Sequence, residues 1–135
     1  MAIESGLGWT AFSVDDSGGN ARDIRASTFN LDWTMPRGVQ DITALSESAM
    51  ARLLLLADFS GTCAGGFDDG SNLAHDVFKT VSSTSVERTV TITISGQTLA
   101  TECILTDYAM TRAQSGEFTW SVPFQLASGL VPTWA

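Results

Sequence analysis

The densest group of side chains that could do chemistry lies in the stretch FDDGSNLAHD, residues 67–76. Within it stand Asp68, Asp69, Asn72, His75 and Asp76. Carboxylate and amide oxygens at this density could bind Ca²⁺, but the glycine is misplaced for an EF-hand loop and no Glu closes the segment. Asp and Asn side chains also stabilise turns by bonding to nearby backbone groups. A solvated loop is therefore the simpler interpretation, and we predict no metal site.

His75 is the only histidine, so any imidazole catalysis would have to use it. A Ser–His–Asp triad would need a serine brought to it by the fold, and the sequence has no GxSxG nucleophile elbow. We interpret His75 and the adjacent Asp76 as a pair that caps the loop. Two of the fifteen acidic residues could serve a glycosidase, but no spacing selects a pair. We predict a protein that is not an enzyme.

The stretch GLGWTA, residues 6–11, matches a relaxed GxGxxA dinucleotide fingerprint. That motif works only between a strand and a helix. Five residues precede Gly6, and the residues after it alternate as a strand does. The match therefore gives no reason to expect a nucleotide or any other cofactor.

Four tryptophans could form a sugar-binding platform. Trp33 and Trp120 are in phase with aliphatic neighbours, which favours the core. Trp9 and Trp134 lie near the two ends of the chain, where exposed tryptophans more often mark contacts between proteins.

The composition excludes several classes of partner. The formal net charge is −8 and only seven residues are basic, so the chain lacks the clustered Lys and Arg that grip nucleic acid or anionic membranes. The start of the chain does not resemble a secretory signal, and the run LLLLA at 53–57 is too short to span a bilayer. Cys63 and Cys103 are interpreted as reduced packing residues of a protein made in a cytoplasm, although a disulfide stays open.

The remaining pattern is mainly that of strands. Residues 9–16, 22–35 and 57–67 read as strands, 86–110 reads as a hairpin with SGQT, residues 95–98, as its turn, and 116–129 alternates most regularly. Pro123 cannot donate to a ladder, so we expect its strand to lie at a sheet edge or to bulge there. Residues 68–84 read as a long loop with a short helical turn near Leu73–Phe78.

One helix is predicted, from Ser46 to Leu56. Ser46 could be its N-cap, and ESAMARLLLL contains strong helix formers without Gly or Pro. Its apolar stripe would pack on the sheet. The predicted helix–sheet core comprises Ala49, Met50, Leu53, Leu54, Phe118, Trp120, Val122 and Phe124. Residues 1–135 would form one domain, an antiparallel β-sandwich or half-barrel with one flanking α-helix.

Three blocks of sequence, RGVQDITALSESAMARLLLLADFSGT, HDVFKT and RTVTITISGQTLATECILTDYAMTRAQSGEFTWSVPFQL, resemble the tail tube proteins of siphophages that infect actinobacteria. The resemblance spans roughly residues 20–134. It implies a structural virion protein whose copies close into hexameric rings, and rings that stack into a tube around a lumen. It further implies residues 1–10 as a flexible arm and 66–84 as a loop that bridges rings.

Under this resemblance, the sheet faces the lumen and the helix packs outside it. The implied lumen-facing residues are Glu87, Thr89, Thr91, Thr93, Glu117, Thr119, Ser121 and Gln125. The expected inter-subunit contacts are Trp9, Phe67, Leu73, Val77, Phe78 and Trp134. An acidic wall almost free of Lys would let DNA pass without binding it, because like charges repel.

The implied partners are other copies of the chain, a tape measure protein, and a tail terminator or distal tail protein. The place would be the virion tail, assembled in the host bacterial cytoplasm. Two alternatives remain open. One is a minor tail, head–tail completion or capsid decoration protein. The other, from a different class, is a carbohydrate- or Ca²⁺-binding β-sandwich module.

Overall fold

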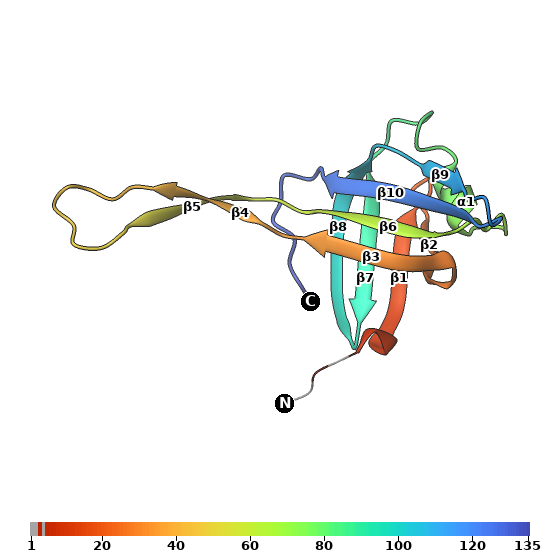
Figure 1. Cartoon of the computed structure of the whole chain (residues 1–135), viewed down its shortest axis with the longest axis horizontal. Coiled ribbons are helices and arrows are strands. Elements are labelled where there is room, and N and C mark those ends of the chain that lie inside the picture. The colour runs from red at the N-terminus through yellow and green to blue at the C-terminus, as the bar shows by residue number, and fades with distance from the viewer. Residues whose placement is uncertain (1–2, 4) are drawn as a thin grey trace.

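The computed structural model describes residue 3 and residues 5–135 (Figure 1). These residues form a mainly antiparallel β architecture with one short α-helix, which confirms the predicted fold class. The strands are β1 Trp9–Asp15, β2 Ala21–Asp23, β3 Thr28–Thr34, β4 Arg37–Asp41, β5 Arg52–Ala57, β6 Ser60–Gly66, β7 Arg88–Ile94, β8 Gln97–Leu105, β9 Ala109–Arg112 and β10 Phe118–Leu126. The helices are α1 Ala74–Phe78 and the 3₁₀ turns η1 Gly6–Gly8 and η2 Arg25–Ser27.

Eight strands form one sheet in the order β2-β1-β7-β8-β10-β6-β3, with β9 paired to β10. The sheet folds over at the junction of β8 and β10, which pair only through Cys103–Leu105 and Phe124–Leu126. Figure 1 shows the result: β10, β6 and β3 cross in front of β8, β7 and β1. The molecule is therefore a two-layered half-barrel, and its two end strands do not pair with each other.

The core lies between these two layers because every second residue of each strand points inward. Val90 and Ile92 of β7 face inward, as do Trp120, Val122 and Phe124 of β10; all five are buried. Cys63 and Cys103 are buried as free thiols in the same core. Burial raises the pKa of each thiol to about 12.

The helix predicted at Ser46–Leu56 is wrong. Arg52–Ala57 is β5, and it pairs with β4 in a separate two-stranded sheet that extends away from the half-barrel (Figure 1). Helix propensity is a weak preference, and pairing with a neighbouring strand overrides it here. Ala49, Met50, Leu53 and Leu54 consequently do not pack on the sheet, and Met50, Leu53 and Leu54 are exposed.

The α-helix of this fold is α1, where the sequence suggested a short helical turn. Its Ala74, Val77 and Phe78 are fully buried in the core. Residues 66–84 are thus only partly a loop, because their middle section covers one end of the sandwich.

Pro123 lies inside the sheet rather than at its edge. On one side β10 pairs with β6 without interruption, and Pro123 lies opposite Thr62. On the other side β10 pairs with β9 up to Ser121 and with β8 from Phe124. Pro123 stands in the gap between these two partners, where a missing backbone donor breaks no ladder bond.

The N-terminal arm predicted at 1–10 lies partly outside the described residues. Residues 1, 2 and 4 lie outside the described residues, Gly6–Gly8 form η1, and Trp9 already begins β1. Among the described residues, no helix has the length and apolar character needed to cross a membrane.

Candidate assembly interface

The hairpin Arg37–Ala57, here called the β-arm, is the most prominent feature outside the half-barrel (Figure 1). In its register Val39 faces Leu54, Gln40 faces Leu53 and Asp41 faces Arg52. At its root, the amide of Asp58 donates to the carbonyl oxygen of Pro36 at 2.9 Å. The β-arm therefore leaves and re-enters the half-barrel at one point.

Local hydrogen bonds explain why the β-arm forms. The amide and hydroxyl of Thr43 donate to Asp41 Oδ1 at 2.9 and 2.7 Å. These two hydrogen bonds, the hydroxyl's first, lower the pKa of Asp41. Across the hairpin, the amide of Ala51 donates to Thr43 Oγ1 at 2.8 Å. The end of β4 is thus tied to the start of β5, which sets the register of the ribbon.

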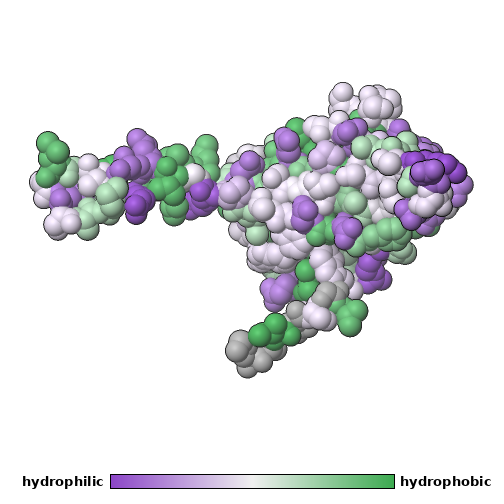
Figure 2. All heavy atoms as spheres, viewed as in Figure 1, coloured by the Kyte–Doolittle hydropathy of each residue, from purple (hydrophilic) through white to green (hydrophobic). Residues whose placement is uncertain are grey.

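The β-arm is apolar and uncovered. Figure 2 shows hydrophobic patches along the β-arm, with hydrophilic patches between them. The exposed large apolar side chains are Val39, Ile42, Leu45, Met50, Leu53, Leu54, Leu55 and Leu56. Soluble monomers rarely expose contiguous apolar surface of this kind, and such surfaces mark protein contacts. Sequence reasoning missed this exposed surface because it assigned these leucines to a packed helix.

A second unfilled surface, partly apolar and partly polar, lies on the half-barrel itself. It is a groove of about 600 Å³ between β1 and β3, lined by Leu7, Trp9, Phe12, Arg25, Thr28, Phe29, Asn30 and Leu31. The Arg25 guanidinium donates to the carbonyl oxygens of Trp9 and Thr10 at 3.1 and 2.6 Å, which occupies the edge of β1. The outer edge of β3 pairs with no strand among the described residues. Unpaired strand edges are templates for association with another chain.

Three of the four tryptophans, Trp9, Trp33 and Trp134, form a packed cluster beside the root of the β-arm. The ring centroid of Trp33 lies 5.9 Å from that of Trp9, in an edge-to-face arrangement, and 6.4 Å from that of Trp134. Trp134 also bridges to Leu99 of β8. This cluster joins β1, β3 and the C-terminal residues, and it is not a flat platform of the kind that stacks on sugars. Trp9 is half-buried and Trp134 is 41% exposed, so both present some surface to a partner.

The other predicted contact residues lie at the end of the molecule opposite the β-arm, and they differ in exposure. Val77 and Phe78 are fully buried, so their prediction as inter-subunit contacts is wrong. Phe67 is 38% exposed, and its ring stacks on that of Phe118 with the ring centroids 4.8 Å apart. Phe118, predicted as core, is itself 41% exposed because it begins β10 at the rim. Leu73 is half-buried beside α1.

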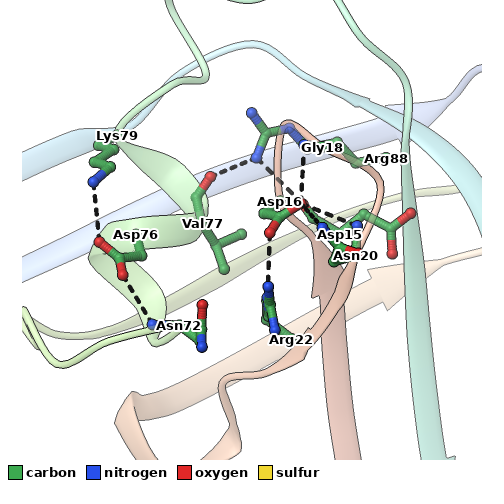
Figure 3. A network of polar contacts seen from close by, with 10 residues as sticks. All are labelled: Asp15, Asp16, Gly18, Asn20, Arg22, Asn72, Asp76, Val77, Lys79 and Arg88. Carbon is green, nitrogen blue, oxygen red and sulfur yellow. Dashed lines mark hydrogen bonds and ion pairs between the residues drawn. The ribbon is translucent and has the colours of Figure 1, made fainter.

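The polar loop residues serve local structure. Asp76 accepts from the amide of Asn72 at 2.8 Å and from Lys79 Nζ at 3.1 Å (Figure 3). These bonds, that from Asn72 first, lower the pKa of Asp76. Asp68 accepts from the amide of Gly70 at 3.0 Å. His75 pairs with the Tyr108 hydroxyl at 3.2 Å rather than with a serine. Asp69 is exposed.

The residues implied as lumen-facing fall on two different faces. Thr89, Thr91 and Thr93 point outward from β7, because the residues between them face the core. Thr119, Ser121 and Gln125 point outward from β10 in the same way. Since β7 and β10 belong to opposite layers, the two groups face away from each other (Figure 1). Glu87 and Glu117 precede these strands and are exposed. At most one group can line a single lumen.

No protein-family model and no curated protein matches the sequence. The structure is similar to a chain in the tail of an empty GTA particle with C6 symmetry, with a TM-score of 0.79 and 15% identity over 98% of this chain and 99% of that chain. It is also similar to a chain in the virion of a native gene transfer agent (GTA) particle, with a TM-score of 0.77 and 14% identity over the same shares. At this level of identity, the likeness establishes that the chains share a fold over nearly their whole length.

Proposed function

We propose that this chain is a structural protein of a phage-like tail, a tube subunit that assembles into stacked six-fold rings around a lumen for DNA. The observation that carries the proposal is the β-arm, which exposes leucines far from the chain's own core. A hairpin of this kind has no stabilising partner within its own subunit. Contact with neighbouring copies would cover it.

The fold likeness supports this assignment. One of the similar chains belongs to a tail assembly with C6 symmetry, and the likeness covers 98% of this chain. The β-arm and the groove lie on different parts of the subunit, so a contact between them is heterologous. Heterologous contacts close into rings when the rotation between subunits permits.

The charge distribution suits a conduit for DNA. The net charge is −8, and no Lys or Arg occurs in β8 or β10. The one cation of β7, Arg88, is buried rather than directed outward. A wall of Thr, Ser and Gln with an acidic background repels phosphate weakly and offers no ion pair to hold it.

In this role the chain is a non-enzymatic part of the virion tail, assembled in the host bacterial cytoplasm. Its first partner is itself. A tape measure protein and a tail terminator or distal tail protein are the further partners of such a tube, and genomic DNA passes through without specific binding.

Excision of the β-arm tests the proposal. Because Asp58 N lies 2.9 Å from Pro36 O, residues 37–57 can be replaced by Asn-Gly, which favours a tight hairpin turn. The matched control keeps the β-arm and carries Asp69→Asn on the exposed loop. Sedimentation velocity over a range of concentrations measures assembly, and thermal unfolding measures the half-barrel.

Wild type and the Asp69→Asn control should form large particles as concentration rises, whereas the excised variant should stay monomeric with an unchanged unfolding temperature. A wild-type chain that stays monomeric at high concentration contradicts the tube. Single rings that never stack would instead favour a head–tail completion protein.

A further inference from the structure

The residues that follow β10, 127–135, form a strap that returns along the free edge of β8 (Figure 1). At the start of the strap, the amide of Ala127 donates to the carbonyl oxygen of Glu102 at 3.0 Å. At its end, the backbones of Thr98 and Ala135 exchange two hydrogen bonds, at 2.8 and 2.9 Å. The strap is therefore tied to β8 at two separate places.

Between these two places the strap is longer than the edge that it spans. Leu126 pairs with Cys103, whereas Trp134 pairs with Leu99. From the first pair to the second, the strap thus advances by eight residues while β8 advances by four. The surplus loops out over residues 128–133 and leaves a groove of about 280 Å³ against β8.

A surplus of four residues allows the strap to pair with β8 in a second register. Side chains and backbone groups of a strand alternate in direction with a period of two residues, so a slip by an even number keeps both in phase. Continuing the register of β10 along β8 places Leu130 opposite Leu99, where Trp134 now lies. Leu130 would then turn towards the core side of the sheet, as Leu99 does.

The second register keeps the present hydrogen bonds in number and satisfies a further backbone. It places Val131 opposite Thr98, where it takes over the two bonds that Ala135 now makes. Ala100 follows two residues after Thr98, so its N–H and C=O point to the same edge. Among the described residues, no backbone bond joins Ala100 to the strap. The second register brings Gly129 opposite it.

The two residues of the strap with special backbones fit both registers. Gly129 now has a φ of 72°, and glycine adopts this conformation and an extended one with similar ease. Pro132 has no backbone donor. In the second register it lies opposite Gln97, where its nitrogen points away from β8 and breaks no ladder bond. Neither residue therefore opposes the slip.

Apolar burial does not strongly favour either register. Leu130 and Val131 are 73% and 65% exposed in the loop, and pairing with β8 would cover part of both. In exchange, Trp134 would lose its contact with Trp33, whose ring centroid lies 6.4 Å away. Trp134 is already 41% exposed, so the two changes oppose each other.

We propose that residues 127–135 are a sliding strap, which pairs with β8 in two registers four residues apart. The slip moves the end of the strap by about 13 Å along the strand, since each residue of a strand rises about 3.3 Å. It withdraws Trp134 from Trp33 and so changes the surface of the subunit beside the root of the β-arm. The inference goes beyond the proposed tube and concerns a single subunit.

Paired cysteines trap each register as a disulfide. The first pair, Thr98→Cys with Ala135→Cys, reports the present register, and the second pair, Thr98→Cys with Val131→Cys, reports the slipped one. The control pair is Thr98→Cys with Leu130→Cys. Leu130 is about as exposed as Val131, but only a slip by an odd number of residues would bring it opposite Thr98. Directly paired residues have the Cα separation that a disulfide needs.

Oxidation is carried out on dilute protein at neutral pH. Cys63 and Cys103 do not compete, because both are buried and the pKa of each thiol is about 12. Peptide mass spectrometry without reduction measures closure. The first and second pairs should both close, and the second should close about tenfold faster than the control pair. Once the second pair is closed, fluorotryptophan NMR should show the Trp134 signal shifted towards that of a solvated ring.

A second pair that closes no faster than the control pair would overturn the inference, because the strap would then have one register or would fray without a second. A Trp134 signal that is the same with either pair closed would overturn it too. Both results would leave the proposed function in place, since they are obtained within one subunit. A wild-type chain that does not assemble would contradict the proposed function and leave the sliding strap unaffected.

Discussion

The guanidinium of Arg88 donates a hydrogen bond to the carbonyl oxygen of Val77, which joins the start of β7 to α1 (Figure 3). It also donates to the carbonyl oxygen of Asp15 at 3.3 Å and to Thr80 Oγ1 at 2.9 Å. Arg88 is only 1% exposed, so these acceptors replace its hydration. The hydrogen bonds of Arg88 thereby hold α1 over one end of the half-barrel.

Arg88→Ala should lower the free energy of unfolding by about 3 kcal/mol, since it removes these bonds and leaves buried acceptors unpaired. Arg88→Lys should recover only part of the loss, because one ammonium lacks the planar fork that reaches separated acceptors. Urea denaturation followed by circular dichroism measures both values. A change below about 0.5 kcal/mol for Arg88→Ala would contradict the role given to this side chain.

Two adjacent glycines of β6 should respond differently to the same substitution. A methyl group at Gly65 would overlap the carbonyl oxygen of Ser27, which is backbone and cannot give way. At Gly66 it would meet the ring of Phe29 at 2.9 Å, and that ring is 69% exposed and free to turn. Gly65→Ala should cost about 3 kcal/mol and Gly66→Ala less than about 1 kcal/mol. Equal unfolding temperatures for the two variants would refute the close approach of β6 and Ser27.

Asp16 should make stability depend on pH at the acid end. Its carboxylate accepts from the amides of Asn20 and Gly18 and pairs with Arg22 at 3.2 Å (Figure 3). These bonds, with that from Asn20 first, hold the pKa of Asp16 below its ordinary value. A lowered folded-state pKa gives stability that is present above the unfolded pKa and is lost as pH falls through the folded one.

Asp16→Asn should therefore melt roughly 2 °C below wild type at neutral pH, and the two should converge as the pH falls through the folded-state pKa of Asp16. Scanning calorimetry across this range measures the difference. A gap that stays constant down to the lowest pH would show that the charge of Asp16 contributes nothing.

The two outward faces of the half-barrel should differ in their effect on DNA. Thr91→Lys places a cation on the β7 face, and Thr119→Lys places one on the β10 face. In the proposed tube only one face can line the lumen, so only one variant should yield tubes that retain DNA at low salt and release it as salt rises. Co-sedimentation of DNA with assembled tubes measures retention. Retention by both variants, or by neither, would contradict the assignment of a lumen to one layer.

The strands could be predicted because their periodicity reports burial directly. Trp120, Val122 and Phe124 alternate in the sequence and are buried in the structure. The turn at Ser95 and Gly96 could also be predicted, because tight hairpin turns require positive φ and favour Gly. Both residues have positive φ in the structure. In each case the signal lies within the segment itself.

The β-arm could not be predicted in the same way. ESAMARLLLL has high helix propensity, but its conformation is set by pairing with residues 37–41 and by the bonds of Thr43. The run of four leucines was a signal, because it places apolar side chains on every side rather than in a stripe. Interpreted as a strand with leucines on both faces, this run would have predicted a contact between subunits instead of a core helix.

The sequence also could not predict that the residues implied as lumen-facing fall on two different faces. Thr91 and Thr119 each occupy a polar face of a regular strand, and nothing local distinguishes one layer from the other. The fold at the β8–β10 junction separates them, and that corner depends on pairing between distant segments. Contacts of this kind are set by topology, not by periodicity.

Electron microscopy of the purified wild-type protein tests the central claim most directly. The account predicts stacked rings with six-fold symmetry in averaged end views and a continuous channel along the axis. Particles that remain single subunits at high concentration, or closed assemblies without a channel, would contradict it.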